Sequence, residues 1–159
     1  MQDLLDDFQR TLEVDGERLL GISEEQSATA RAAGKWSPKQ IIGHLIDSAA
    51  NNHQRFVRAQ LSDELAFSGY QQEEWVRVQG YDSEPWQQLV QLWKSYNLHL
   101  LHVMSLSSEE ARTKPRVKHN LDEIGWNTVS KTEPVTLEYF MRDYVAHMKN
   151  HLRQILDSR

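Results

Sequence analysis

Apolar residues recur at helical spacing along most of the chain, separated by polar and often acidic residues. Positions three and four apart lie on one face of a helix, so this spacing predicts amphipathic helices. The first stripe comes before Gly21, a residue type that commonly follows a helix end. It consists of Leu4, Leu5, Phe8, Leu12, Leu19 and Leu20.

Two capping boxes predict where the next helices begin. In this pattern a serine and a glutamine three residues later satisfy the free backbone donors of a helix start. Residues 23–26 have the pattern and predict a short helix that ends at Gly34. Residues 37–40 have it too, with Pro38 at the first helical position, and they start the second long helix. Its stripe is Ile41, Ile42, Leu45, Ile46, Ala49, Phe56 and Val57.

Proline marks the starts of the third and fourth long helices. The third opens near Ser83 and Pro85, and the fourth opens at Thr136, just after Pro134. The third stripe is Trp86, Leu89, Val90, Trp93, Tyr96, Leu100, Leu101 and Met104. The fourth is Leu137, Phe140, Met141, Tyr144, Val145, Met148, Leu152, Ile155 and Leu156.

Four amphipathic helices predict a bundle, because each apolar stripe must be covered by another helix. We find no β-type alternation of useful length, no internal repeat and no linker. We therefore expect an all-α four-helix bundle that forms one domain over residues 1–159.

Two long connections, residues 62–82 and 107–135, interrupt this simple pattern. Connections of this length are uncommon in compact domains and often functional. One interpretation is surface decoration that is held down by Trp75 and Trp126. The other is that the two connections wall a pocket at one end of the bundle.

Composition excludes several classes of protein. The net charge of −5 argues against a general nucleic-acid binder, which needs a dense basic face. The absence of cysteine excludes disulfides, thiolate metal sites and thiol nucleophiles. No apolar run approaches the length of a membrane span, and the acidic N-terminus is unlike a secretory signal. We expect a cytoplasmic protein.

His147 and His151 are the first candidates for chemistry. Their spacing of four residues puts both imidazoles on one helix face, where they can converge on one metal ion. His44 lies at the edge of the stripe of the second long helix, so two helices can supply three nitrogens to one centre. Three protein ligands and an open position are typical of catalytic zinc sites. The alternatives are hydrogen-bonded core histidines for the pair and a partly exposed histidine for His44.

The other histidines make weaker candidates. His99 and His102 are three residues apart and can share a metal, but His99 is expected to face outward. His53 lies about 13 Å along the axis from His44, too far for the same ion. His119 lies in a connection and has no spacing that demands a role.

The residues from Trp36 to Ser48 resemble the W-S-x-x-(E/Q)-x-x-x-H-L-x-D-S segment of the DinB-like superfamily. The last helix, with Tyr144 before His147 and His151, is similar to the aromatic and H-x-x-x-H signature of its YfiT and bacillithiol-transferase branch. The stretch from Lys118 to Leu137 resembles the family's connecting loop. One departure is Asn150, where the branch often has another histidine.

This resemblance implies an up-down-down-up four-helix bundle, usually dimeric, and a divalent metal held by His44, His147 and His151. Zinc is our first choice of metal, with nickel, iron or manganese as alternatives, because imidazole accepts all of them. Members of the superfamily include thiol-dependent S-transferases, and many others are labelled as hydrolases. A low-molecular-weight thiol is therefore a candidate cofactor, and a second copy of the chain is the expected partner.

Several side chains are candidates for a supporting role. Asp47 lies one turn after His44 and is expected either to orient a ligand or hold a partner across the bundle, or to be an exposed helix residue or one that bonds a neighbouring helix. Tyr144 is expected either to offer its hydroxyl to a substrate or to pack in the core. Asn51 has similar alternatives, and Trp36 is expected to be a packing anchor. The basic run 112–118 is expected either to attract an acidic thiol or to be a solvated loop.

Two function classes follow from these residues. The first is a metal-dependent enzyme, a thiol S-transferase or a hydrolase, that acts on a small molecule. The second is a binding or stress protein that keeps the bundle and the metal without catalysis. A third interpretation is an all-α interaction module without a metal. An open coordination position that faces a cavity favours the enzyme.

Overall fold

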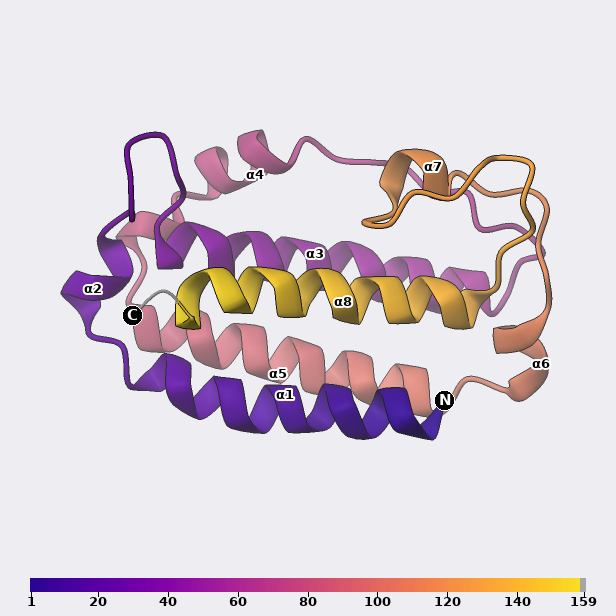
Figure 1. Cartoon of the computed structure of the whole chain (residues 1–159), viewed down its shortest axis with the longest axis horizontal. Helices are drawn as coiled ribbons and strands as arrows, with labels where there is room; N and C mark the ends of the chain where they lie inside the picture. Colours follow the sequence, from indigo (N-terminus) through magenta and orange to yellow (C-terminus); the bar gives the residue numbers. More distant parts are fainter. Residues whose placement is uncertain (158–159) are drawn as a thin grey trace.

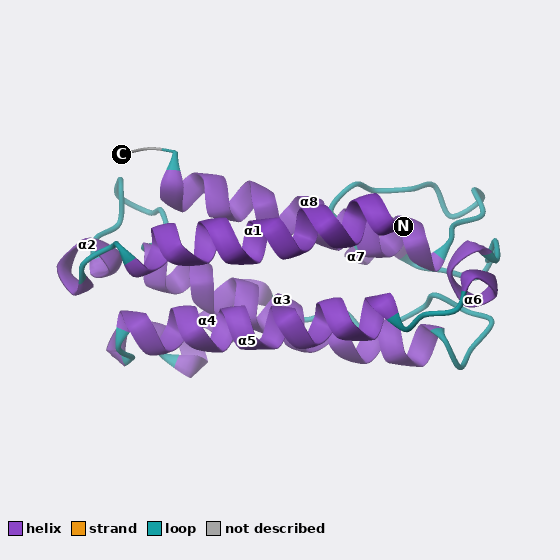
Figure 2. Ribbon diagram, turned by 90° about the horizontal axis from the view of Figure 1, so that it is seen from below, coloured by secondary structure: helices purple, strands orange, loops and turns teal. Residues whose placement is uncertain are grey.

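The computed structural model describes residues 1–157, and its four long helices lie side by side (Figure 1). They are α1 (Gln2–Leu20), α3 (Pro38–Ala59), α5 (Trp86–Ser105) and α8 (Leu137–Leu156). Figure 2 shows them as two layers, with α1 and α8 in one and α3 and α5 in the other. The expected all-α four-helix bundle is confirmed.

Ion pairs show that α1 and α8 run in the same direction. Asp3 pairs with Arg142 at 2.9 Å, and Asp7 pairs with Lys149 at 2.8 Å, so residue numbers increase together along both helices. The same parallel order holds in the other layer, where Lys39 reaches the carbonyl of Glu84 and the ring of His53 lies 6.0 Å from that of Tyr96.

Contacts between the two layers run in the opposite sense. His44 and Phe56 of α3 contact His151 and Phe140 of α8, so the two helices are antiparallel. In the same way, the indole of Trp86 at the start of α5 donates to the carbonyl of Leu19 at the end of α1, 2.9 Å away. The order of directions is therefore up-down-down-up.

The predicted stripes form the core between the layers. Most positions of each stripe are buried because a helix packs its apolar face against its neighbours and leaves its polar face in water. The assignment of Val57 to the second stripe was wrong: it is 38% exposed, because it directly follows the buried Phe56 and so points away from the core face of the helix. Aromatic rings fill much of this space, and Phe56 has edge-to-face contacts with both Phe140 and Tyr144. The largest fully buried side chains include Trp86, Trp93, Phe8, Phe56, Leu12, Leu19, Ile42, Leu45, Leu89, Leu100 and Met104.

The predicted helix starts are confirmed. At α3 the Ser37 hydroxyl accepts from the Gln40 backbone at 3.2 Å, and the Gln40 side chain accepts from the Ser37 backbone at 2.9 Å. Ser23 forms the same reciprocal box with Gln26, and Thr136 caps α8 by accepting from the Tyr139 backbone alone. One end was wrong: α2 (Glu24–Ala28) stops six residues before Gly34.

Backbone geometry explains why α2 is short. Thr29 adopts an extended conformation, and its hydroxyl bonds the carbonyl of Glu25, which competes with helical bonding. Gly34 then lies in the left-handed region with φ of 74°, where it serves the turn before Ser37.

The two long connections contain short helices and touch each other. The first holds α4 (Gln72–Gln79) and the 3-10 helix η1 (Tyr81–Ser83). The second holds α6 (Glu109–Thr113) and α7 (Leu121–Ile124). A β-bridge between Leu65 and His119 joins them. Figure 1 shows α4 and α7 along one flank of the bundle, beside α3 and α8.

The expected tryptophan anchors were wrong. Trp75 is 38% exposed and lies against Tyr70, and Trp126 is 48% exposed. The buried anchors of the connections are smaller apolar side chains and one tyrosine, namely Leu65, Val76, Tyr81, Leu121 and Val135. An amphipathic indole at a connection can cover a surface without entering the core.

The basic run 112–118 holds the connections together and is not a free solvated loop. Arg116 is buried, and its guanidinium donates to the carbonyl of Ala59 at 3.0 Å. The other three cations pair with acidic residues: Arg112 with Glu138, Lys114 with Asp63 and Lys118 with Glu64.

Within residues 1–157, every helix is too short or too polar to cross a membrane.

Candidate metal centre

Three histidines from two helices meet between α3 and α8. A nitrogen of each of His44, His147 and His151 lies within 4.8 Å of the others. The closest pair is His44 Nε2 and His147 Nε2, which are 3.2 Å apart. The ring centroids of His44 and His151 are 4.8 Å apart, and those of His147 and His151 are 4.6 Å apart.

Local sequence explains how each ring is placed. His44 follows the capping box of α3 by one turn, among Ile42, Leu45 and other buried apolar positions, and it is only 1% exposed. His147 and His151 are one turn apart on α8 and are half-buried. Since α3 and α8 are antiparallel, the start of one helix lies beside the end of the other.

Burial keeps these imidazoles neutral. Desolvation, with the neighbouring histidines, lowers the pKa of His44 to about 3 and that of His147 to about 4. Desolvation also lowers the pKa of His151. Metal ions bind the neutral imidazole, so the free rings already have the required protonation state.

The separation of His44 and His147 fits a shared ion. Two imidazole nitrogens on a tetrahedral zinc ion are separated by about 3.3–3.4 Å, because each bond is about 2.0–2.1 Å long. The separation of 3.2 Å between His44 Nε2 and His147 Nε2 is close to this value. His151 Nδ1 lies 3.2 Å from Gln154 Oε1, and donation there leaves Nε2 with a free lone pair.

Two tryptophans cover the histidines. The ring of Trp36 lies 5.3 Å from that of His44, and the ring of Trp126 lies 5.2 Å from that of His147 and 6.2 Å from that of His151. Asp143 of α8 holds the Trp126 segment, because its carboxylate accepts from the Trp126 backbone at 2.7 Å and from the Asn127 backbone at 2.8 Å.

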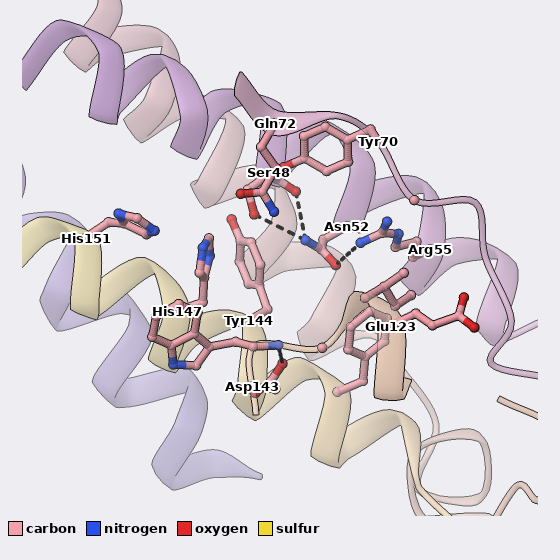
Figure 3. Close-up of a pocket in the computed structure, with 15 residues that line it drawn as sticks. Ser48, Asn52, Arg55, Tyr70, Gln72, Glu123, Asp143, Tyr144, His147 and His151 are labelled. Atoms are coloured by element: carbon pink, nitrogen blue, oxygen red, sulfur yellow. Dashed lines mark hydrogen bonds between the residues drawn. The ribbon is translucent and has the colours of Figure 1, made fainter. Parts of the chain in front are cut away.

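A cavity of about 320 Å³ opens beside His147 and His151. It lies between α3 and α8 and is closed by residues 69–72 and 123–126 of the two long connections (Figure 3). Its polar lining includes Ser48, Asn52, Arg55, Tyr70, Gln72, Glu123 and Asp143.

A family model of the DinB superfamily matches residues 8–155 of this chain. The chain belongs to the DinB superfamily. Among solved structures, the fold is similar to that of YfiT from Bacillus subtilis, with a TM-score of 0.76 and 18% sequence identity. The match covers 99% of this chain and 86% of that one. YfiT is described as a probable metal-dependent hydrolase with an unusual four-helix bundle topology. No curated protein matches the chain significantly.

The two long connections form part of the wall of a pocket, as one of the two interpretations of these connections predicted. The pocket differs from that expectation in its place, because it lies along the flank of the bundle and not at its end. The reason is that α4 and α7 lie lengthwise beside α3 and α8.

Asp47 bonds the first connection and does not touch the histidines. Its carboxylate is buried and accepts from the Tyr81 hydroxyl at 2.7 Å and the Gln79 side chain at 2.6 Å. Burial raises the pKa of Asp47, and these two donors oppose the rise. The nearby Asn51 donates to the Asp47 carbonyl at 2.9 Å. Both residues therefore support the helix and the first connection.

Tyr144 lines the cavity, but its hydroxyl is used in the core. It donates to Asn97 Oδ1 on α5 at 2.5 Å, and burial raises the pKa of this hydroxyl well above its usual range. This hydrogen bond favours the alternative in which Tyr144 packs in the core.

The remaining histidines lie outside the group of three. His119 is buried, with Nε2 at 2.8 Å from the Glu133 carbonyl, so it is a structural residue. His99 and His102 are exposed on α5, and His99 contacts His53 at a ring distance of 5.0 Å. Asn150 is half-buried and does not line the cavity.

Sequence reasoning missed a polar stripe on α3. Ser48, Asn52 and Arg55 follow His44 at successive intervals of four, four and three residues, and all three line the cavity. This spacing places them on one helix face and was readable from the sequence. Tyr70 had no such signal, because its position depends on the path of the first connection.

Proposed function

We propose that this protein is a metal-dependent enzyme that acts on a small molecule, with His44, His147 and His151 as the metal ligands. One observation carries the proposal: three neutral imidazoles meet in one group, and two of them, His147 and His151, line a cavity of about 320 Å³. This combination of metal ligands and an adjoining concave space is typical of catalytic sites.

Zinc is the first candidate for the metal, and nickel, iron and manganese are alternatives, because a set of imidazoles accepts each of them. A bound divalent ion would act as a Lewis acid that polarises a substrate and acidifies a bound water or thiol. The description of YfiT as a probable metal-dependent hydrolase supports the proposal.

The chain's own residues would bind, orient and shield the substrate. Trp126 covers the histidines on the cavity side and limits their access to water. Ser48, Asn52 and Tyr70 offer neutral polar groups along the cavity wall. Burial and the nearby Asp47 charge raise the pKa of Tyr70 to about 12, so this hydroxyl is a hydrogen-bond donor at neutral pH.

Two reactions are compatible with this site, namely hydrolysis and the transfer of a low-molecular-weight thiol to an electrophile. Both need a nucleophile that loses a proton near the metal ligands and a substrate that is held in the cavity. The site itself does not distinguish them, so the enzyme is tested for both.

A second candidate is a metal-binding protein without catalysis. The observation that favours it is Trp126, whose ring lies across two of the three histidines. An aromatic cover that never moves would keep substrates from the metal. We place the enzyme first because Trp126 is 48% exposed and the cavity reaches the histidines beside it.

Metal analysis and an activity screen test the proposal together. Untagged protein should bind about one equivalent of zinc, and His147→Ala should lose most of this binding. His102→Ala is the matched control, because it removes an exposed histidine of α5. Zinc-loaded protein is then assayed for hydrolysis of esters and amides and for conjugation of thiols to electrophiles.

Different results separate the candidates. Zinc binding with either activity, both lost in His147→Ala, supports the enzyme. Zinc binding without activity in either screen favours the non-catalytic candidate. Equal zinc binding by His147→Ala and the unmutated protein contradicts the assigned ligands.

The proposal also includes a cytoplasmic location, which rests on composition, and a homodimer, which rests on family resemblance. Cell fractionation checks the location, and the mass of the protein in solution checks the dimer.

A further inference from the structure

Arg55 is a buried cation at the far end of the cavity from the histidines. Its side chain belongs to the cavity lining, yet the residue is only 6% exposed. Figure 3 shows it on the same helix as Ser48 and Asn52, on the opposite side of them from His147 and His151. Eleven residues separate it from His44, which corresponds to about 16 Å along the axis of α3.

Arg55 has few partners for a buried guanidinium. It donates to the carbonyl of Ser68 at 2.9 Å and to Asn52 Oδ1 at 3.5 Å, whereas a guanidinium carries five N–H donors. Within residues 1–157, no salt bridge joins it to an acidic side chain. The one charge interaction that raises its pKa comes from Tyr70, and burial lowers that pKa overall.

The acidic residues that line the cavity have partners other than Arg55. Asp143 accepts three hydrogen bonds from the backbones of Trp126 and Asn127 and from the Asn127 side chain. Glu123 is exposed and pairs with Lys131 at 3.0 Å. Neither carboxylate balances the charge of Arg55.

Arg116, the other buried arginine, shows what a purely structural role looks like in this fold. Its guanidinium donates to the carbonyls of Ala59, Ala111 and Lys114, which together tie the end of α3 to the second connection. Arg116 does not line the cavity. Arg55 has a single backbone carbonyl as partner and an open space beside it.

A buried cation without a counter-ion is unfavourable, and an anion from outside the chain would remove the imbalance. We propose that Arg55 binds a carboxylate of the substrate, at the end of the cavity remote from the three histidines. The assignment of this carboxylate to a substrate rests on the proposed function. The substrate is then elongated, with its reacting atom at the histidines and its carboxylate at Arg55.

The residues between these two ends fit that arrangement. Ser48, Asn52 and Tyr70 are neutral and polar, so they can bond the middle of such a molecule without competing for its charge. Arginine suits a carboxylate better than lysine does, because its planar donors form two parallel hydrogen bonds.

Binding of a simple carboxylate by metal-free protein tests the proposal directly. The full chain, labelled with ¹⁵N, is titrated with succinate and, as a neutral analogue of the same shape, with succinamide. The Nε–Hε signal of Arg55 reports binding at this side chain. Arg55→Gln removes the cation from the cavity, and Arg58→Gln is the matched control, because it removes an exposed arginine one turn along the same helix.

We expect succinate to shift the Arg55 signal saturably and succinamide to leave it unchanged. Arg55→Gln should weaken succinate binding at least about tenfold, and Arg58→Gln should change it by less than about twofold. No saturable shift in the unmutated protein, an equal response to succinamide, or equal succinate affinity in Arg55→Gln would overturn the proposal.

Two further variants separate loss of the carboxylate site from misfolding and from loss of the metal site. If Arg55→Gln does not fold, as judged by circular dichroism, Arg55→Lys takes its place, with an expected weakening of severalfold because the paired hydrogen bonds are lost. His147→Ala should keep its succinate affinity while it loses zinc. Failure of the metal site and failure of the carboxylate site therefore give different results.

Discussion

Gly43 and Tyr81 show how closely the first connection packs against α3. A Cβ atom on Gly43 would lie 2.0 Å from Cδ2 of the Tyr81 ring, a distance at which atoms overlap. Tyr81 is buried, and its hydroxyl bonds Asp47, so the ring has little room to move. Glycine is therefore required at position 43, directly before a proposed metal ligand.

We expect Gly43→Ala to lower the free energy of unfolding by at least about 2 kcal/mol, because the added methyl displaces the Tyr81 ring. Gly16→Ala is the control, since that buried helical glycine faces only the flexible Lys94 side chain. It should be neutral or stabilising by up to about 1 kcal/mol, because alanine favours helix. Urea unfolding of both variants checks this, and an unchanged stability of Gly43→Ala would contradict the observed packing.

From the hydrogen bond between Asp47 and Tyr81 we predict a contribution to stability that depends on pH. Burial raises the pKa of Asp47, so folding disfavours its ionised form, and this carboxyl contributes stability that is lost as the pH rises through its folded pKa. The Tyr81 hydroxyl donates to the Asp47 carboxylate at 2.7 Å, which stabilises the ionised form and reduces this loss of stability.

Tyr81→Phe should therefore destabilise the protein more at pH 8, where Asp47 is ionised, than at pH 4. The expected loss at pH 8 is about 1.5–3 kcal/mol, which is typical of a hydrogen bond to a charged group. Tyr139→Phe removes a surface hydroxyl that donates one long hydrogen bond, 3.3 Å to the Asn127 carbonyl, and it should cost less than about 0.5 kcal/mol at both pH values. Urea unfolding at the two pH values measures both; a larger loss at pH 4 would refute the assigned bond.

At the scale of elements, the second connection is fixed over the histidines by hydrogen bonds with side chains of α8. Asp143 accepts hydrogen bonds from the backbones of Trp126 and Asn127, which follow α7. The carboxylate lies one turn before His147, so the helix that carries two of the histidines also holds their cover. Access to the site is therefore coupled to the bonds that α8 makes to this segment.

Asp143→Ala should free the segment around Trp126. We expect faster amide hydrogen exchange at Trp126 and Asn127, together with a loss of about 1–3 kcal/mol of stability, because their part-buried donors lose a charged acceptor. Asp157→Ala, at the C-terminal end of α8, should leave exchange at these amides unchanged. Unaltered exchange in Asp143→Ala would show that the segment is held by other contacts.

On the scale of the whole molecule, the histidines connect the two layers of the bundle. His44 belongs to one layer and His147 and His151 belong to the other, so an ion bound by all three would hold α3 against α8. A ligand that binds only the folded chain stabilises it by mass action.

Zinc at a hundredfold excess over its dissociation constant should raise the free energy of unfolding by about 2.7 kcal/mol. For a chain of this length, we expect a rise in melting temperature of about 5–10 °C. Scanning calorimetry with and without zinc measures it, and His147→Ala should show less than about a quarter of the rise. The same rise in both proteins would place the zinc elsewhere.

Local sequence was enough to determine the four long helices and part of the site. The capping boxes at Ser23 and Ser37 and the apolar stripes act within a few residues, so they fix helix starts and buried faces. The pairing of His147 with His151 is equally local, because residues four apart on a helix always share a face.

Only the tertiary structure decided what these local features meet. His44 lies 103 residues before His147, and their contact follows from the antiparallel packing of α3 and α8. The exposure of Trp126, the use of the Tyr144 hydroxyl in the core and the isolation of Arg55 from carboxylates also depend on chain segments far apart in sequence. Spacing along a helix determines which face a side chain is on, whereas the packing of distant segments determines what that face touches.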